Sequence, residues 1–154
     1  MKRLLIVLIA ALGAFLLFRW SRSASEPGEA ERNRRFTESM AGVTLVGHST
    51  RTNREGLSKE ERYIIEKVTH LTGDTWLFQT RLKYDDRDIP VPFPVTVKWA
   101  GDTPVITLTD LAIPGVGTYT ARVVLYRDQY AGTWSAKSVG GQLFGRIVKG
   151  VAPL

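Results

Sequence analysis

The sequence predicts an all-β domain, an antiparallel up-and-down meander of about eight strands that forms a small barrel, preceded by an N-terminal hydrophobic helix. Three observations favour this fold class. Apolar residues recur at every second position after residue 41, as in strands with one buried face. Turn-forming residues separate these segments, and no helical stretch is long enough to join parallel strands. A meander with one apolar face buries that face most completely when it curls into a barrel.

Residues 1–20 are expected to be a signal peptide or a membrane anchor. A basic start precedes the unbroken apolar run of residues 4–18. As a helix this run is about 22 Å long, shorter than a bilayer core of about 30 Å, which favours a signal peptide. Cleavage after Ala24 would place Arg22 where a small side chain is needed, and Trp20 suits the membrane interface, which favours an uncleaved anchor. The expected location is the cell envelope: anchored in the inner membrane and facing the periplasm or exterior, or secreted after cleavage.

The charge and the cysteine count exclude several classes of function. The formal net charge is +6, but residues 1–24 carry four basic residues and no acidic ones. The remainder holds 17 basic and 15 acidic residues, so it is nearly neutral and no nucleic-acid partner is expected. The chain has no cysteine, which excludes disulfides and a thiol nucleophile.

The rest of the chain divides into a tether, a barrel domain and a tail. Residues 21–40 are polar and charged, and a short helix is predicted at Glu29–Met40 within this tether. The β-barrel domain is predicted to span residues 41–149, and residues 150–154 form a C-terminal tail.

The alternation of apolar and polar residues locates each strand of the barrel domain. In the clearest strand Trp76 and Phe78 share one face, while Gln79 lies on the other. The connection between the first two strands is long and charged, and Ser58 and Glu61 within it match a capping box, which predicts one helical turn. The eight predicted strands span residues 43–49, 62–71, 76–84, 89–99, 105–111, 119–125, 129–135 and 142–148.

Prolines and glycines mark where the barrel wall is irregular. Pro90, Pro92 and Pro94 remove three backbone donors from one strand edge, so either the barrel is open at this seam or the ladder begins only near Val95. Strand glycines near the C-terminus permit bends or close backbone approach. These glycines are Gly132, Gly140, Gly141 and Gly145. We therefore expect the last two strands to form a hairpin with a turn over residues 136–141, and the last strand to pair with the first.

Three blocks of the sequence carry a resemblance: VKWAGDTPVITLTDL (97–111), IPGVGTYTARV (113–123) and YAGTWSAKSVGGQLFG (130–145). They resemble an uncharacterised family of small exported bacterial proteins. The resemblance spans roughly residues 41–149, and it implies export and a domain of this extent but no catalytic residues. The predicted architecture is similar to lipocalin-like barrels. Lipocalins carry a Gly-x-Trp motif on the first strand, whereas residues 132–134 place that pattern here on the seventh.

The inward face supplies the candidate ligand-cavity or core residues. Its aromatic and aliphatic side chains suit a small apolar ligand, but the same side chains would also fill an eight-stranded barrel, whose interior is narrow. The candidates are Trp76, Phe78, Leu82, Tyr84, Phe93, Val95, Trp99, Tyr119, Val123 and Trp134.

Three polar residues are candidates for the rim of a site: His48, His70 and Asp102. The two histidines end neighbouring predicted strands, which could bring them together as a metal or acid–base pair. No ligand spacing accompanies them, so ordinary polar histidines at strand ends are the favoured interpretation and no metal is expected. Asp102 follows Trp99 in a turn that either closes a hairpin or forms part of a partner-binding rim. No nucleophile motif is visible, so no catalytic residue and no cofactor are predicted and the chain is not expected to be an enzyme.

Together these features predict a non-enzymatic exported or membrane-anchored β-barrel domain. It would contact the membrane through residues 4–18 and bind a small apolar ligand on its inward face. The alternative is a structural or protein-interaction module of the cell envelope, with an envelope protein as its partner.

Overall fold

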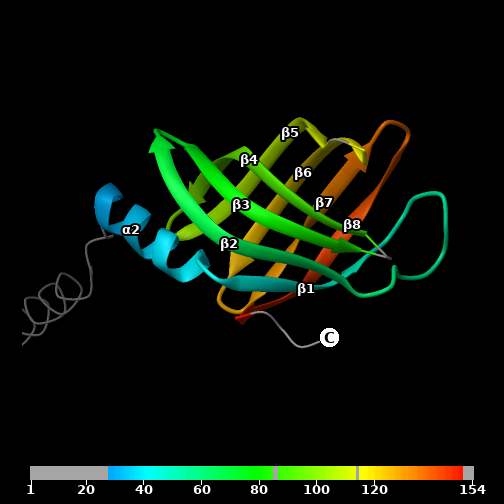
Figure 1. The fold of residues 1–154 in the computed structure, drawn as a ribbon, viewed down its shortest axis with the longest axis horizontal. Coiled ribbons are helices and arrows are strands. Elements are labelled where there is room, and N and C mark those ends of the chain that lie inside the picture. The colour runs from blue at the N-terminus through cyan, green and yellow to red at the C-terminus, as the bar shows by residue number, and fades with distance from the viewer. Residues whose placement is uncertain (1–27, 85–86, 114, 151–154) are drawn as a thin grey trace, which may run out of the picture.

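The computed structural model describes residues 28–84, 87–113 and 115–150, with residues 82–84 and 87–89 described by their backbone alone. Eight antiparallel strands follow one another in sequence order around a closed barrel, and one helix precedes the first strand in this described part (Figure 1). The predicted fold class is therefore confirmed, and the barrel is closed. The hydrophobic helix expected at residues 1–20 lies outside the described residues. Within them, no helix is long and apolar enough to cross a membrane.

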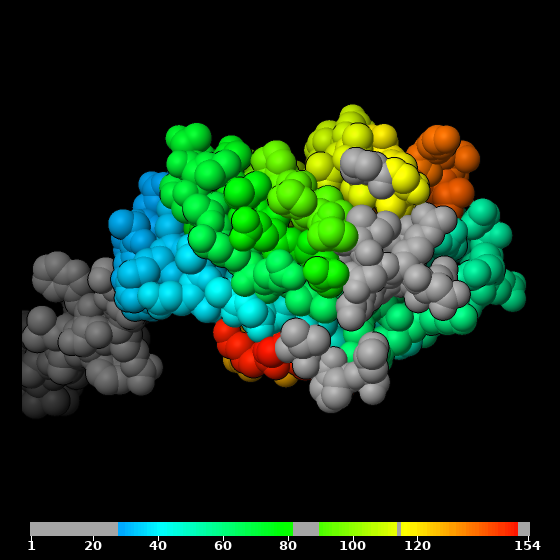
Figure 2. Space-filling view, in the orientation of Figure 1, coloured from blue at the N-terminus to red at the C-terminus, as the bar shows by residue number. Residues whose placement is uncertain are grey.

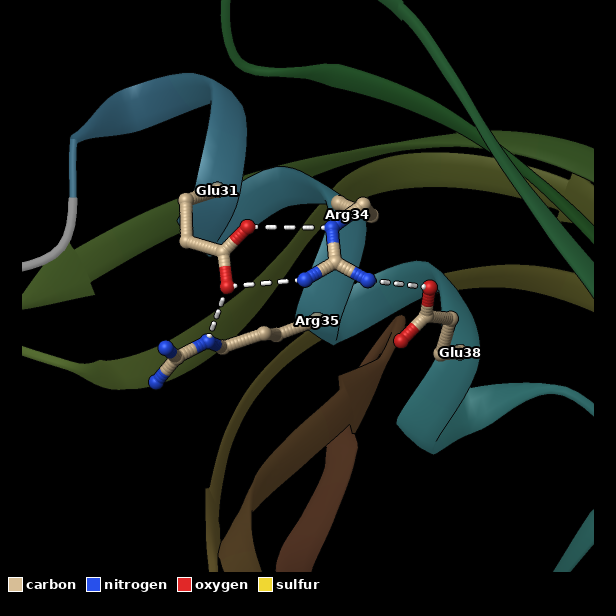
Figure 3. Close-up of polar contacts among 4 residues, drawn as sticks. All are labelled: Glu31, Arg34, Arg35 and Glu38. Carbon is tan, nitrogen blue, oxygen red and sulfur yellow. Dashed lines mark hydrogen bonds and ion pairs between the residues drawn. The ribbon is translucent and has the colours of Figure 1, made fainter.

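The helix α2 (Glu29–Met40) has the bounds that the sequence predicts. Its first turn carries Glu29 and Glu31, which complement the positive end of the helix dipole. On the exposed side Glu31 accepts hydrogen bonds from Arg34 and Arg35, three and four residues away (Figure 3). These contacts, that of Arg35 first, lower the pKa of Glu31. The opposite side of α2 is apolar and packs on the barrel.

The strands agree in number and order with the prediction, and each differs from it by at most three residues at an end. The β7–β8 turn is shorter than predicted, because pairing continues to Ala136↔Val139 and leaves only Lys137 and Ser138 between the strands. The strands are β1 (Val43–Ser49), β2 (Glu61–Thr72), β3 (Thr75–Tyr84), β4 (Arg87–Ala100), β5 (Thr103–Ile113), β6 (Gly117–Tyr126), β7 (Gln129–Ala136) and β8 (Val139–Lys149).

Pairing of β8 with β1 closes the barrel, as expected from the sequence. The ladder runs from Val43↔Lys149 to Ser49↔Leu143, and Gly47 lies opposite Gly145 in its middle. A Cβ atom on Gly145 would lie 2.1 Å from the carbonyl oxygen of Val46. The two backbones therefore approach too closely for any side chain at this point of the seam.

The proline-rich part of β4 is paired on one side only. Pro90, Pro92 and Pro94 lie opposite β3, whereas pairing with β5 begins at Thr96↔Thr107. Of the two alternatives that the prolines leave open, a ladder that begins near Val95 is the one the structure shows. The missing donors face the side on which no ladder forms, so the prolines are accommodated within a closed barrel.

The connection between β1 and β2 does not form the predicted helical turn. Ser58 instead accepts a hydrogen bond at Oγ from the Ser49 backbone N–H (2.8 Å). Glu61 begins β2, where its carboxylate accepts hydrogen bonds from Ser49 Oγ (2.7 Å) and the Tyr63 hydroxyl (2.6 Å). The capping-box prediction is wrong because both of its residues are held by tertiary partners.

The two ends of the barrel differ. We call the end with the β2–β3, β4–β5 and β6–β7 turns the helix-side mouth, because α2 lies across it (Figure 1). The other end, with the long β1–β2 connection, is the loop-side mouth. Figure 2 shows α2, in blue, seated against the barrel at the helix-side mouth. Phe36 and Met40 of α2 are buried there and join the hydrophobic core of the barrel.

Candidate functional site

A groove of about 800 Å³ lies between α2 and the rim of the helix-side mouth. We call it the helix-side groove. Its walls come from α2, from the β4–β5 and β6–β7 turns, and from the end of β8. The lining residues are Arg32, Arg35, Phe36, Ser39, Met40, Val43, Trp99, Asp102, Thr103, Pro104, Leu125, Tyr126, Arg127, Asp128, Ile147 and Lys149.

The floor of the groove is apolar and is organised around Phe36. The ring of Phe36 meets Trp76 edge to face with centroids 5.0 Å apart, and it meets Trp99 in the same way at 5.4 Å. Edge-to-face pairs of this kind favour one ring orientation over others. Leu125 and Ile147 complete the floor from the opposite wall. The floor is thus part of the barrel core, and its geometry depends on α2 staying in place.

The rim of the groove is basic. Arg32, Arg35, Arg127 and Lys149 lie on it, against Asp102 and Asp128. The guanidinium carbon of Arg32 lies 4.6 Å from the centre of the Trp99 ring, a cation–π contact. The buried Nε of Arg32 has no hydrogen-bond partner among the described residues. Arg32 therefore has an unsatisfied hydrogen-bond donor, its Nε–H, at the boundary between the floor and the rim.

Arg127 occupies a strained backbone position. It lies in the two-residue β6–β7 turn with φ of +56°, in the left-handed region that favours glycine. Lys137 has the matching place in the β7–β8 turn at the loop-side mouth, with φ of +53°. Each turn thus holds a basic residue where glycine would be relaxed, one beside the groove and one at the far end of the barrel.

The predicted cavity residues divide between the core and the groove. Trp76, Phe78, Val95 and Val123 are buried in the hydrophobic core, with Phe93, Trp99 and Trp134 packed partly buried against it. Tyr119 lies 6.3 Å from Trp134, centroid to centroid, toward the loop-side mouth. The side chains of Leu82 and Tyr84 lie outside the described part. Of the residues predicted for a cavity, Trp99 lines the groove.

The three predicted rim residues are not brought together. His48 lies at the loop-side mouth with Nδ1 3.1 Å from the carbonyl oxygen of Ser58, whereas His70 lies at the helix-side mouth with Nε2 2.8 Å from that of Gly73. The alternative in which the two histidines meet does not occur, because in an antiparallel pair the end of β1 lies beside the start of β2. Asp102 lines the groove. Among the described residues, no three metal-ligating side chains form a cluster.

A second polar cluster lies inside the loop-side half of the barrel. Burial and the nearby charge of Glu61 raise the pKa of Tyr63 well above its usual value, and burial raises that of Tyr130 as well. The Tyr130 hydroxyl and the Trp134 indole N–H have no partner in the described part of the chain. Both tyrosines therefore stay protonated, and of the two the Tyr63 hydroxyl donates a hydrogen bond, to Glu61.

We expect this cluster to make the domain sensitive to alkaline pH. An unfolded tyrosine ionises near pH ~10, whereas folded Tyr63 holds its proton at higher pH. The unfolded state therefore binds fewer protons above pH ~10, so the free energy of unfolding falls as pH rises from there. Tyr63→Phe should flatten this fall in urea melts between about pH 8 and pH 11. Tyr126→Phe, at an exposed site, is the control and should leave the fall intact; equal pH profiles for the two variants would contradict the assignment.

Sequence reasoning missed the residues that α2 contributes to the groove. It placed Glu29–Met40 in a polar tether, although Arg32, Phe36 and Met40 recur at the i, i+4 spacing of one helix face. That spacing was the available signal for an apolar helix face. Two apolar residues among many charged ones made it weak.

The site at the helix-side mouth is thus an apolar floor enclosed by a basic rim, built from a helix and three separate parts of the barrel wall. Comparison with known proteins finds no family model, no curated protein and no solved structure that matches this chain.

Proposed function

We propose that this chain is a non-enzymatic binding barrel, held at the cell envelope by its N-terminal segment, and that the helix-side groove takes a small apolar ligand. The groove itself is the observation that supports this function. Its volume of about 800 Å³ lies within the range of roughly 300–1,000 Å³ that small-molecule sites occupy. An apolar floor with a few polar groups on its rim is also the usual composition of such sites.

The groove is a better candidate than the barrel interior. Trp76, Phe78 and Val95 are buried in contact with other core residues, and Phe36 packs on them from α2. Eight strands enclose a space that side chains of this size can fill. The ligand would therefore lie at the mouth, between α2 and the barrel, and not along the barrel axis.

The chemistry of the described polar residues supports binding and not catalysis. His48 and His70 lie at opposite mouths of the barrel, so they cannot act together as an acid–base pair. Tyr63 and Tyr130 keep their protons because their pKa values are raised. The groove offers cationic side chains, which suit the binding of a ligand.

A substitution that fills the groove tests this function. Ser39 lines the groove and is exposed, so Ser39→Phe should occupy ligand space without disturbing the core. With full-length protein in phosphatidylcholine vesicles, a neutral aryl-diazirine probe should label residues 99–104 and 125–128. Ser39→Phe should cut that labelling about tenfold, equivalent to ~1.4 kcal/mol.

Glu38→Phe is the matched control, because Glu38 lies beside Ser39 on α2 but pairs with Arg34 on the exposed side. It should label like the parent protein. Labelling of the groove peptides that is equal in both variants, or absent from the parent, would rule out a ligand site here.

A second candidate function, a protein-interaction module of the envelope, rests on the outer face of the barrel. Val105, Val124, Ala131 and Phe144 form a row across β5, β6, β7 and β8. Val124 and Phe144 are 42% and 40% exposed, and exposed apolar rows of this kind are features of partner surfaces. The labelling experiment separates the two candidates, because a module without a ligand would show no preferred labelling of the groove.

A further inference from the structure

We infer that the ligand of the helix-side groove is an anionic phospholipid taken from the membrane leaflet beside the domain, with its phosphate on the basic rim and an acyl chain on the apolar floor. This inference rests on the proposed function of the groove. Three observations support it: the charge of the rim, the unsatisfied donor of Arg32 and the place of α2 in the chain.

Four cationic side chains line the groove, and they come from three separate elements. Arg32 and Arg35 come from α2, Arg127 from the β6–β7 turn and Lys149 from β8. Arg35 is paired with Glu31 (2.6 Å), and Lys149 donates a hydrogen bond to the Ser39 carbonyl oxygen (2.8 Å). Arg32, Arg127 and Lys149 face two aspartates, so the rim still carries a net positive charge, although the chain beyond residue 24 is nearly neutral. Arginine and lysine donors around one space form strong, charge-assisted hydrogen bonds to phosphate oxygens. A neutral apolar ligand could not form such charge-assisted hydrogen bonds with these side chains.

Arg32 has an unsatisfied donor that a bound anion would explain. The Nε of Arg32 is buried without a partner in the described part, which is unfavourable for a strong donor. An unsatisfied donor that persists beside a groove indicates that the side chain serves a ligand there.

The place of α2 in the chain brings the groove near a bilayer. Residues 19–28 alone separate the apolar run of residues 4–18 from the first turn of α2, and a chain of that length reaches at most ~35 Å. With residues 4–18 in the membrane, as the proposed function has it, the first turn of α2 lies within ~35 Å of the apolar run and can reach the lipid head groups. Acidic lipids there would attract a basic rim. The occupant is therefore a lipid of that leaflet and not a solute from the bulk.

The two hairpin turns provide a matched pair of variants. Arg127→Gly removes one cation at the groove, and Lys137→Gly removes one cation at the loop-side mouth. Both replace a residue of positive φ by glycine, so both relieve the same backbone strain and should fold at least as well as the parent protein. Any difference between them in lipid binding therefore reports on position and not on folding or total charge.

The experiment uses the full-length protein in phosphatidylcholine vesicles that contain a trace of lipid with a photoactivatable acyl chain. We expect the phosphatidylglycerol analogue to label residues 99–104 more strongly than the phosphatidylcholine analogue. Arg127→Gly should lower that preference about fivefold, whereas Lys137→Gly should leave it unchanged. Equal labelling by the two analogues, or equal preference in the two variants, would overturn the inference.

Two further arms separate this inference from the function on which it rests. Binding of the neutral aryl-diazirine probe without preference for the anionic lipid would preserve the proposed function and refute the lipid assignment. Absence of labelling by every probe would refute both. Free oleate that suppresses the labelling as well as unlabelled phosphatidylglycerol does would identify a fatty acid as the occupant, and this result would also overturn the inference.

Discussion

Gly132→Ala is expected to leave the barrel unable to fold. A Cβ atom at this position would lie 1.9 Å from the carbonyl oxygen of Arg122 and 2.9 Å from Cα of Val123 on the neighbouring strand β6. Both atoms belong to the backbone, so no side chain can rotate to make room. Relief requires separation of β6 and β7, and we expect a loss of about 4–5 kcal/mol or more of the free energy of unfolding.

A graded series of glycine variants checks this result. Gly140→Ala should cost less, because its nearest neighbour, the carbonyl oxygen of Trp134, is 2.9 Å away, and Gly28→Ala should cost least, because nothing lies within 4 Å. Circular dichroism and hydrogen exchange of the full-length protein would give the order. A stable Gly132→Ala barrel would show that β6 and β7 do not approach as closely as the structure has them.

Phe36→Ala is expected to have the second largest effect, because it removes the side chain that attaches α2 to the barrel. Phe36 is 4% exposed and contacts the rings of Trp76, Phe78 and Trp99. Truncation of a buried phenylalanine costs ~3–5 kcal/mol when the site cannot collapse. Phe36→Ala should also release α2, so amide exchange in residues 29–40 should become fast.

Phe144→Ala is the control for that experiment. The same side chain is removed from an exposed site on β8, so the free energy of unfolding should change by less than about 1 kcal/mol. Equal losses for the two variants would mean that the ring of Phe36 is not part of the core. Protected amides in residues 29–40 of Phe36→Ala would mean that α2 docks through other contacts.

Much of the fold could be predicted from the sequence because its signals are local. Alternation along each strand decides which residues face inward, and Trp76, Val95 and Val123 are buried as that alternation requires. Closure also follows from local information. Strand glycines such as Gly145 indicate a sharp bend or a close approach, and a meander with two free edges can hide both by pairing them.

The site could not be predicted to the same extent, because its parts come from distant places in the chain. Trp99 was a candidate for the interior and Asp102 for a rim, but nothing in the sequence shows that Arg32 lies over Trp99. The positions of the two histidines also depend on the tertiary structure. Adjacent strands do not make adjacent strand ends, because antiparallel pairing places His48 and His70 at opposite mouths.

The sequence by itself determined the strand order, the inward face and the bounds of α2, since periodicity and helix propensity act over a few residues. Only the tertiary structure decided the role of α2. A helix with two buried residues, Phe36 and Met40, is stable where an apolar surface receives it, and that surface exists only once the barrel has closed. The helix-side groove is the space left between a cylindrical helix and the uneven turns of the mouth. It arises from the packing of these elements, so no single segment of the sequence predicts it.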